Sequence, residues 1–253
     1  MKPTERFSDR ADDYAKWRPS YPPEVVDTMG LAPGALVADI GAGTGISSEL
    51  FLRRGYRVVA VEPNAAMREK AERALTAYPD FRATTGTAEA TGFQDESVDA
   101  VFCAQAFHWF DAKRARDEFL RIVKPSSVIG ICWNDRRRDG SAFLHGLESL
   151  FMRHSADYRE RIHPRTVAAM ASVERTFAPR RVDVAILPNA QTFDWDGLLG
   201  RVRSASYVPL EGCPEHETFF DGLRALFDAE STGGFVRIEY ECRLYRVCCA
   251  AWF

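Results

Sequence analysis

The chain has 253 residues, of which 46% are apolar and 27% are charged, and its formal net charge is −3. A chain of this length and composition can bury a hydrophobic core without disulfides or a metal ion. The one basic run that stands out is Arg136-Arg137-Arg138, which argues against nucleic acid as the main partner, because phosphate binding usually requires an extended basic surface.

The N-terminus and the cysteines indicate neither export nor a metal site. The stretch through Trp17 is polar and charged, and no apolar run in the chain approaches the length of a membrane span. The six cysteines are scattered and lack the spacing of metal ligands. We therefore expect a cytoplasmic protein with reduced thiols, no metal and no membrane contact.

The first elements in chain order are two short helices in a polar segment. One is expected over Ala11–Trp17, and the next runs from Pro23 through Met29, because proline is favoured in the first turn of a helix. The proline-rich stretch between them separates the two helices.

From Leu36 onward, apolar strand patterns alternate with helical patterns. The expected strands are Leu36–Ile40, Arg57–Val61, Phe81–Thr85, Val98–Ala104, Val128–Trp133, Arg181–Leu187 and Phe235–Ala250. The expected helices are Gly45–Arg54, Ala65–Tyr78, Ala112–Val123, Ser141–His154, Thr166–Phe177, Trp195–Ser204 and Pro214–Ala229. This alternation predicts a parallel sheet covered on both faces, and the last two strands are expected as an antiparallel pair at its edge.

The strongest functional signal is the stretch Val37–Gly45, which follows the first strand and opens a helix. Its glycines allow a tight turn and a close approach of the backbone to a ligand at the carboxyl end of the strand. The spacing is Gly-x-Gly-x-Gly, with Ile46 in the place of the third glycine of a dinucleotide site. A carboxylate at Asp39 would repel a pyrophosphate, but it would attract the ammonium of a methionine tail, directly or through water, and it suits a sulfonium. The pattern therefore favours S-adenosylmethionine as the cofactor.

Glu62 is the second element of this site. It ends the second strand, 62 − 39 = 23 residues after Asp39. An acidic residue about 20 residues further on grips the ribose hydroxyls in these folds. The alternative is a solvated glutamate at a strand end.

Further motifs extend the pattern over nearly the whole chain. They are Tyr14 with Arg18-Pro19-Ser20-Tyr21-Pro22, the loop Asp39–Gly45, Val61-Glu62-Pro63-Asn64 with Met67, Gly86-Thr87-Ala88-Glu89, Ala104-Gln105-Ala106-Phe107-His108-Trp109-Phe110, and Arg203-Ser204-Ala205-Ser206-Tyr207. With these motifs the chain resembles the class I S-adenosylmethionine-dependent methyltransferases, and within them the small-molecule group that includes trans-aconitate methyltransferase-like proteins. The resemblance implies a Rossmann-like α/β fold with a seven-stranded, mostly parallel sheet, helices on both faces, an antiparallel last strand pair and an N-terminal helical lid.

The resemblance also implies which residues contact the cofactor. The methionine and ribose portions would be lined by Gly41, Ala42, Gly43 and Gly45, and the ribose hydroxyls would be held by Glu62. The adenine would be surrounded by Asn64, Met67, Thr87, Ala88 and Glu89. The methyl-transfer site would be bordered by Gln105, and the lid would be closed by Tyr14 and Arg18. Plainer alternatives stay open for four of them: core packing for Met67, a surface helix for Tyr14 and Arg18, and an exposed position for Glu89.

His108 is the candidate catalytic residue. Histidine can act as a base near neutral pH, and its place after the fourth strand turns it toward the acceptor. Its aromatic neighbours also fit a packing role, and they would attract a cationic sulfonium and exclude water. The expected reaction is an in-line displacement in which the protein supplies alignment. Arg136-Arg137-Arg138 could bind an anionic acceptor or form a solvated loop.

No linker composition divides the chain, so we expect one domain over residues 1–253. It would consist of a lid (1–30), a cofactor-binding half (31–135) and a helical insertion with the edge strands (136–253). We expect a small-molecule acceptor, no nucleic acid, and a monomer or homodimer. A protein that binds S-adenosylmethionine without catalysis, or one that methylates RNA or protein, stays open. A nicotinamide oxidoreductase is disfavoured by the glycine spacing and by the lack of a Tyr-x-x-x-Lys pair of the short-chain dehydrogenase type.

Overall fold

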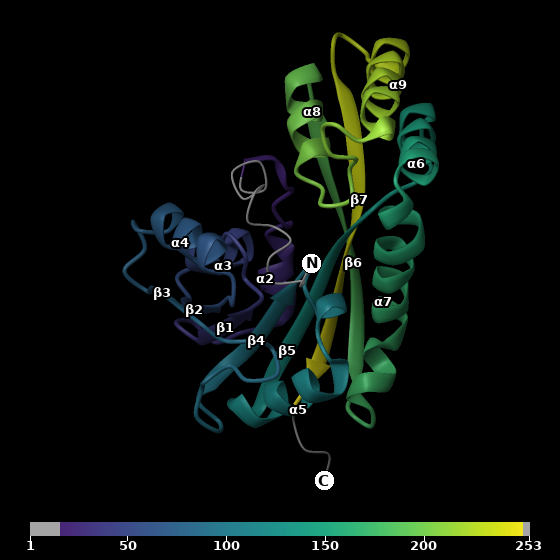
Figure 1. Ribbon diagram of the computed structural model, residues 1–253. Helices are drawn as coiled ribbons and strands as arrows, with labels where there is room; N and C mark the ends of the chain where they lie inside the picture. The colour runs from purple at the N-terminus through teal and green to yellow at the C-terminus, as the bar shows by residue number, and fades with distance from the viewer. Residues whose placement is uncertain (1–15, 250–253) are drawn as a thin grey trace.

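A seven-stranded sheet forms the centre of the computed structural model, which describes residues 16–249 (Figure 1). The strands are β1 (Leu36–Ile40), β2 (Arg57–Val61), β3 (Phe81–Thr84), β4 (Val98–Ala104), β5 (Val123–Arg136), β6 (Val182–Phe193) and β7 (Val236–Cys248). Their order in the sheet is β3-β2-β1-β4-β5-β7-β6. The first five strands are parallel, and β7 runs antiparallel to both β5 and β6. The predicted Rossmann-like sheet with an antiparallel last pair is therefore confirmed.

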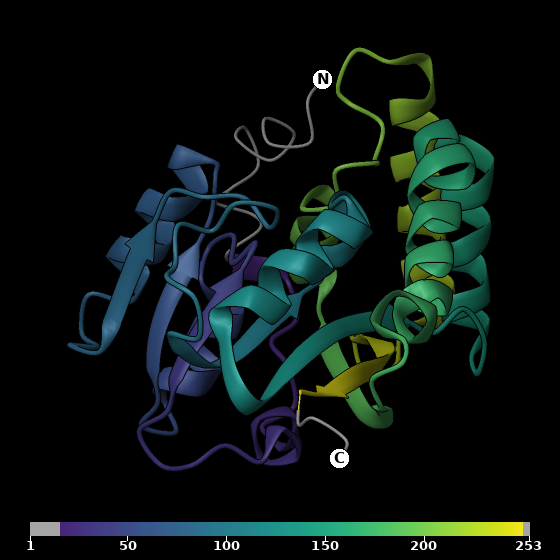
Figure 2. The ribbon, with the colours of Figure 1, turned by 90° about the horizontal axis from the view of Figure 1, so that it is seen from below.

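Helices cover both faces of this sheet, as predicted (Figure 2). The helices are α2 (Glu24–Met29), α3 (Ile46–Leu52), α4 (Ala65–Ala74), α5 (Ala112–Ile122), α6 (Ala142–His154), α7 (His163–Phe177), α8 (Trp195–Arg203) and α9 (Pro214–Glu230), with a 3₁₀ turn η3 (Phe107–Trp109) and a π turn η4 (Tyr158–Ile162). Helices α2, α3 and α4 bury their apolar sides on one face, and α5 and α7 bury theirs on the other. Apolar strands enclosed in this way need no polar face, which explains their continuous hydrophobic runs.

Strand β6 is longer than the sequence indicated, whereas β7 (Val236–Cys248) lies within its expected range Phe235–Ala250. Strand β6 was expected to end at Leu187, but it continues through Pro188 to Phe193 and pairs with β7 along its whole length. Proline is tolerated there because β6 is an edge strand, where one side needs no ladder donor. Strand β5 pairs with β7 only as far as Arg136, so the far end of the antiparallel β6–β7 pair projects beyond the rest of the sheet.

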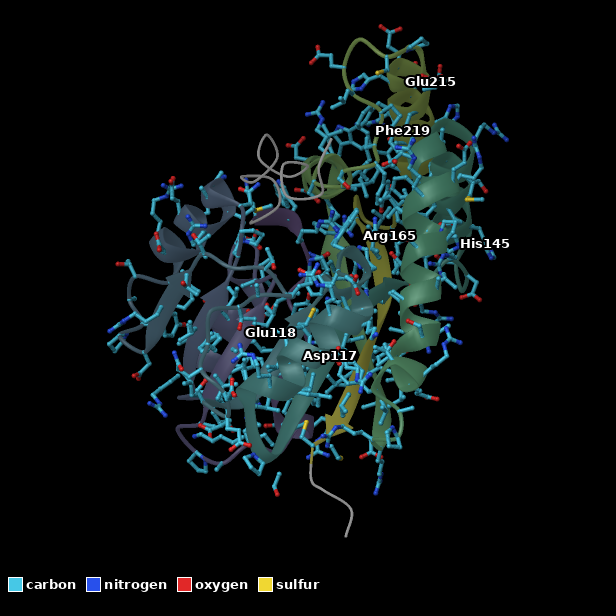
Figure 3. All side chains as sticks on the ribbon, turned by 60° about the horizontal axis from the view of Figure 1, so that its bottom comes forward. Asp117, Glu118, His145, Arg165, Glu215 and Phe219 are labelled. Atoms are coloured by element: carbon cyan, nitrogen blue, oxygen red, sulfur yellow. The ribbon has the colours of Figure 1, made fainter. Side chains whose placement is uncertain are left out.

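A third apolar cluster covers this projecting end. Helices α6, α8 and α9 pack there around side chains such as Leu147, Leu198 and Phe219, and Phe219 is fully buried (Figure 3). We call these three helices, together with the projecting end of the β6–β7 pair, the cap. The π turn η4 precedes α7, which begins at His163 rather than at the expected Thr166.

Part of the expected N-terminal lid lies outside the described residues, including Tyr14 and most of the helix expected over Ala11–Trp17. The last turn of that helix, Lys16 and Trp17, is helical. A side chain at Gly200 of α8 would collide with the Trp17 indole, so the N-terminal segment docks closely on the cap. Within residues 16–249, no helix combines the length and apolar character needed to cross a membrane.

Candidate active site

A cavity of about 370 Å³ opens at the carboxyl ends of the parallel strands, where open α/β sheets bind their ligands. One wall comes from the loops after β1, β2, β3 and β4, and the opposite wall from the end of β5 and from the cap and α7. Twelve of the expected site residues line it: Arg18, Gly41, Ala42, Gly43, Glu62, Asn64, Met67, Thr87, Ala88, Glu89, Gln105 and His108. Asp39 and Gly45 do not, and Tyr14 is not among the described residues.

The glycine loop turns from β1 into α3 with three left-handed residues, Gly41 (φ 70°), Gly43 (φ 58°) and Gly45 (φ 87°). A Cβ built on Gly43 would meet no atom within 4 Å, so Gly43 presents bare backbone to the cavity. A Cβ on Gly45 would lie 2.8 Å from Leu75 Cδ1. Gly45 therefore serves the packing of the loop against the region of α4, which corrects the expectation that it lines the cofactor.

Asp39 lies behind the loop rather than on the cavity wall. It is fully buried, and its Oδ2 accepts hydrogen bonds of 2.7 Å from the hydroxyls of Ser47 and Ser48. Burial raises the pKa of Asp39 to about 6, although the two hydroxyls act in the opposite direction. Ser47 does line the cavity, so the carboxylate reaches a ligand only through that hydroxyl or through its field. Direct contact with Asp39, one of the two modes expected from the sequence, is not what the geometry offers.

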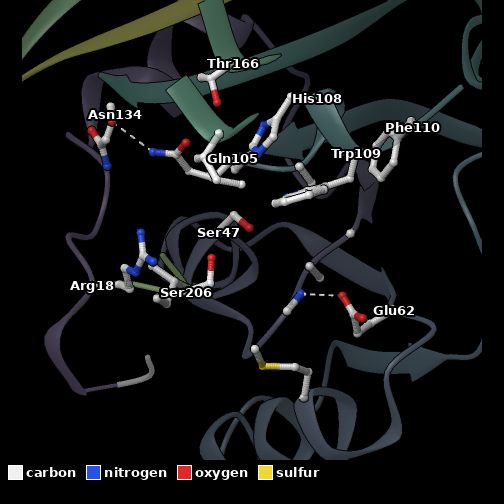
Figure 4. Close-up of a pocket in the computed structure, with 18 of the residues that line it drawn as sticks. Arg18, Ser47, Glu62, Gln105, His108, Trp109, Phe110, Asn134, Thr166 and Ser206 are labelled. Atoms are coloured by element: carbon white, nitrogen blue, oxygen red, sulfur yellow. Dashed lines mark hydrogen bonds between the residues drawn. The ribbon is translucent and has the colours of Figure 1, made fainter. Parts of the chain in front are cut away.

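Glu62 forms a fixed acidic point in the wall (Figure 4). Its Oε2 accepts from the backbone N–H of Gly43 and its Oε1 from that of Asn64, both at 2.9 Å. Burial raises the pKa of Glu62 above its usual value, although these two N–H groups lower it again. Each carboxylate oxygen keeps a further lone pair, which suits the hydroxyls of a ribose. The plainer alternative of a solvated glutamate is wrong, since Glu62 is 9% exposed.

The neighbouring expected residues also have structural duties. The side chain of Asn64 caps α4 by accepting from Met67 N at 3.1 Å, and Met67 itself is 3% exposed. Glu89 accepts a hydrogen bond of 2.9 Å from the backbone N–H of Asp111, so it ties two loops together rather than standing idle. These contacts hold the loops that form the cofactor side of the cavity.

Gln105 follows β4 in a left-handed conformation (φ 53°), which is strained for a residue with a side chain. Its N–H donates to Cys132 O at 2.8 Å, and its side-chain amide donates to Asn134 O at 2.9 Å. Both bonds lead to β5, so Gln105 is held at the junction between the two walls (Figure 4). Backbone strain of this kind concentrates at functional sites.

Sequence reasoning missed most of the opposite wall. It is lined by Asn134, Asp135, Arg136, Arg138, Tyr158, Ile162, His163, Thr166, Arg201, Ser206, Tyr207 and Tyr240. Only the arginine run and the Ser206-Tyr207 motif carried a signal in the sequence. The remaining residues come in ones and twos from several helices and strands, so no local pattern marks them.

The arginines of this wall are held by a half-buried acid, Glu148. Arg136 forms an ion pair with Glu148, and Arg138 approaches the same carboxylate at 3.8 Å and Asp135 at 3.1 Å. The hydroxyl of Tyr158 donates to Glu148 at 2.9 Å, and burial raises the pKa of Tyr158 to about 12. The solvated-loop alternative for the arginine run is therefore wrong for Arg136, whose side chain is 11% exposed.

His108 lies in η3, between the two walls. It is 9% exposed, and its Nδ1 accepts from Trp133 Nε1 at 3.3 Å. Its ring lies 4.8 Å from that of Trp109, and its carbonyl accepts from Arg165. Burial, together with the charges of Arg165 and Arg18, lowers the pKa of His108 to about 3. This environment disfavours the expected role as a base, because an efficient base has a pKa near the working pH.

Comparison with known proteins agrees with this geometry. Residues 38–131 match a family model described as a methyltransferase domain. An uncharacterized methyltransferase of Mycobacterium tuberculosis is 42% identical over 130 residues, which is 51% of this chain and 52% of that protein. A demethylmenaquinone methyltransferase of Renibacterium salmoninarum is 38% identical over 106 residues, or 42% of this chain and 44% of that protein. The chain spans about half the length of the curated relatives it matches.

The fold has a counterpart among solved structures. A protein of Anaeromyxobacter dehalogenans, described as a type II methyltransferase, superposes with a TM-score of 0.71 at 22% identity, over 93% of this chain and 99% of that one. At this identity the likeness speaks for the fold alone. Residues 38–131 are thus similar to a methyltransferase domain, and they lie within a fold shared with that solved structure.

Proposed function

We propose that this protein transfers the methyl group of S-adenosylmethionine to a small-molecule acceptor. The observation that carries the proposal is the continuity of the cavity. It joins the glycine loop and Glu62 on one side to a separately built wall on the other. A protein that only stored the cofactor would need the first wall and not the second. The trans-aconitate-like subtype, the single-domain organisation and the monomeric or dimeric state belong to the same proposal.

The residues on the cofactor side fit S-adenosylmethionine. Gly43 leaves open space for a ligand against the backbone, and Glu62 offers acceptors to a ribose. Met67 and Ala88 supply an apolar surface for an adenine ring. Asp39 and Glu62 make this side acidic, which suits a cationic ligand and opposes a pyrophosphate. When bound, the cofactor supplies an electrophilic methyl group.

The protein would contribute position and exclusion of water. Trp109 and Phe110 line the cavity beside the end of β4, and aromatic faces favour a cationic centre. Arg18 donates to Ser204 O at 3.0 Å, so it joins the N-terminal segment to the cap next to the cavity. Alignment of an acceptor with the methyl group in a dry pocket supplies much of the rate enhancement in such a displacement.

The acceptor is inferred to be small for two reasons. A cavity of about 370 Å³ falls within the range of small-molecule sites. The relative from Renibacterium salmoninarum is named for a quinone precursor, which is a small molecule, although the match covers less than half of either chain.

The proposal is tested by calorimetric titration of the full chain with S-adenosylhomocysteine and S-adenosylmethionine, followed by a screen of small acids and phenols for transfer of a labelled methyl group. Glu62→Gln is expected to weaken binding by about tenfold or more, because a charged acceptor contributes roughly 1.5–3 kcal/mol. Glu215→Gln, a matched change at an exposed position of α9, is expected to bind like the unaltered protein. Binding of neither compound by the folded protein would overturn the proposal, and binding without transfer to any acceptor would favour a non-catalytic role.

A further inference from the structure

The contact between Trp133 and His108 determines more than packing. Trp133 of β5 is 1% exposed and packs edge-on against the rings of Phe107 and Tyr245. Its indole N–H can only donate, and it donates to His108 Nδ1 at 3.3 Å. If the imidazole were flipped, a carbon would face this N–H, and a buried N–H without an acceptor costs roughly 1–3 kcal/mol. The ring orientation of His108 is therefore set by Trp133.

This contact also assigns the proton on the ring. An Nδ1 that accepts a hydrogen bond carries a lone pair, so the neutral ring holds its proton on Nε2. The charged groups that act on the ring are Arg165 of α7 and Arg18 of the N-terminal segment. Both are cations and oppose an imidazolium, in the same direction as burial. His108 is therefore neutral, with an N–H at Nε2.

The position of η3 leaves Nε2 for a ligand. Arg165 of α7 donates to the carbonyl of His108 and lies 4.9 Å from the Trp109 ring, so this turn is held against α7. His108 lines the cavity together with Gln105 on one side and Thr166 on the other (Figure 4). Since Nδ1 is occupied by the buried indole, Nε2 is the ring nitrogen that remains for an occupant of the cavity.

A second histidine across the cavity is held in the same way. His163, the first residue of α7, has its Nδ1 3.2 Å from Arg138 Nη2. A guanidinium can only donate, so this Nδ1 also accepts, and a neutral His163 also carries its proton on Nε2. In both histidines of the cavity Nδ1 is the accepting nitrogen, so Nε2 carries the proton of the neutral ring.

We propose that His108 is a neutral hydrogen-bond donor, through Nε2–H, to an oxygen of the methyl acceptor, and that Trp133 is the positioning residue that holds it in this tautomer. The part of the proposal that concerns the acceptor rests on the function proposed above. A ring in this state has no lone pair toward the cavity, so it does not remove a proton from the acceptor. The acceptor would be an oxygen-bearing molecule whose reacting atom is already unprotonated. Its lone pair forms the bond to the methyl carbon, the electron pair of the broken bond stays with the leaving sulfur, and no proton passes to His108.

The first test needs neither cofactor nor acceptor. The ¹⁵N spectrum of the imidazoles is recorded for the full chain from about pH 5 to pH 8, with His108 assigned by its loss in His108→Gln. The expected result is an unprotonated Nδ1 and a protonated Nε2 throughout. Trp133→Phe removes the donor and is expected to give a mixture of tautomers. Trp195→Phe, which removes an indole from the cap, is expected to leave the His108 signals unchanged. A ring protonated at Nδ1, or an imidazolium within this range, would overturn the assignment.

The second test uses any acceptor that the methyl-transfer screen identifies. Glutamine keeps an N–H donor but has no basic lone pair, so His108→Gln is expected to retain most of kcat/KM, whereas His108→Ala is expected to lose at least tenfold, mainly through KM. The pH profile of kcat/KM is expected to show no histidine ionisation. Equal loss in both variants, with their folds intact by circular dichroism, would contradict the donor role. Failure of the protein to bind S-adenosylmethionine would contradict the proposed function, whereas the tautomer of His108 would still be decided by the ¹⁵N spectrum.

Discussion

The two walls of the cavity differ in how their residues are supplied. The cofactor wall comes from four short loops that each follow a strand, and most of its members are consecutive residues within one loop. The opposite wall takes one to three side chains from each of β5, η4, α7, α8 and β7 and from the loop after α8. In a wall made of contiguous loops, the positions of the side chains are determined by the local conformation of each loop. In a wall made of scattered side chains, these positions depend on how whole helices pack. The first wall therefore specifies a cofactor class, and the second can change with the packing of the cap.

The cap can be weakened without touching either wall. Phe219 of α9 is fully buried among the cap side chains and does not line the cavity. Phe219→Ala is expected to lower the free energy of unfolding by about 3–5 kcal/mol in a denaturant titration. Binding of S-adenosylhomocysteine by the folded fraction is expected to stay unchanged if the two walls are independent. A parallel loss of affinity would show that the cap also shapes the cofactor wall.

Lowering the pH is expected to weaken the contacts of Glu118, which support the cofactor wall through Thr91. Burial alone would raise the pKa of Glu118, but its hydrogen bonds with Arg121 and Thr91 outweigh burial and lower the pKa to about 2. A lowered pKa stabilises the fold above the unfolded value of about 4.3, and the contribution is lost as pH falls toward 2. Glu118→Gln is expected to cost about 1–3 kcal/mol at pH 7, and the difference from the unaltered protein should shrink between pH 4 and pH 2 in thermal melts. A constant difference over this range would contradict the assignment.

A pair of glycines separates backbone strain from ligand contact. Gly43 (φ 58°) and Gly55 (φ 78°) both have open space where a Cβ would stand, but only Gly43 lines the cavity. Alanine at either position is expected to cost about 1–2 kcal/mol in stability, because a left-handed conformation is strained with a side chain. Only Gly43→Ala is expected to weaken binding of S-adenosylhomocysteine in calorimetry. Equal binding of S-adenosylhomocysteine by the two variants would show that Gly43 is not part of the cofactor site.

The smallest effect is expected on the outside of the second wall. Arg137 is 41% exposed and pairs at 3.4 Å with Glu239, whereas its neighbour Arg138 lines the cavity. Arg137→Ala is expected to change stability by no more than about 1 kcal/mol, since exposed ion pairs contribute little. It should leave both cofactor binding and methyl transfer unchanged, while Arg138→Ala should alter the KM for the acceptor. A larger effect of Arg137→Ala on binding or methyl transfer would show that Arg137 also belongs to this wall.

The sequence predicted the sheet well because its strands are continuous apolar runs separated by glycines and prolines. It predicted the glycine loop and Glu62 because their function requires fixed residue types at fixed spacing after a strand. The positions of Asp39 and Gly45 could not be predicted, since they lie two residues before Gly41 and one residue before Ile46, which do line the cavity, and only the geometry of the turn decides which residues face inward. Likewise, the partner of His108 is a tryptophan 25 residues away on the neighbouring strand, and only strand pairing brings the two together.

The projecting end of the β6–β7 strand pair affects how the molecule opens. Beyond the last β5–β7 pair, Arg136↔Tyr240, the ladder continues for four residue pairs, Ala190↔Glu239 to Phe193↔Val236, in which β7 pairs with β6 and no longer with β5. Amide protons at Ala190–Phe193 are therefore protected by a smaller cooperative unit than those of Val182–Leu187, which share the main core. In native-state hydrogen exchange the outer amides should exchange through a partial opening, and the inner ones only with global unfolding. Such a partial opening would expose the opposite wall of the cavity while the cofactor wall stays folded.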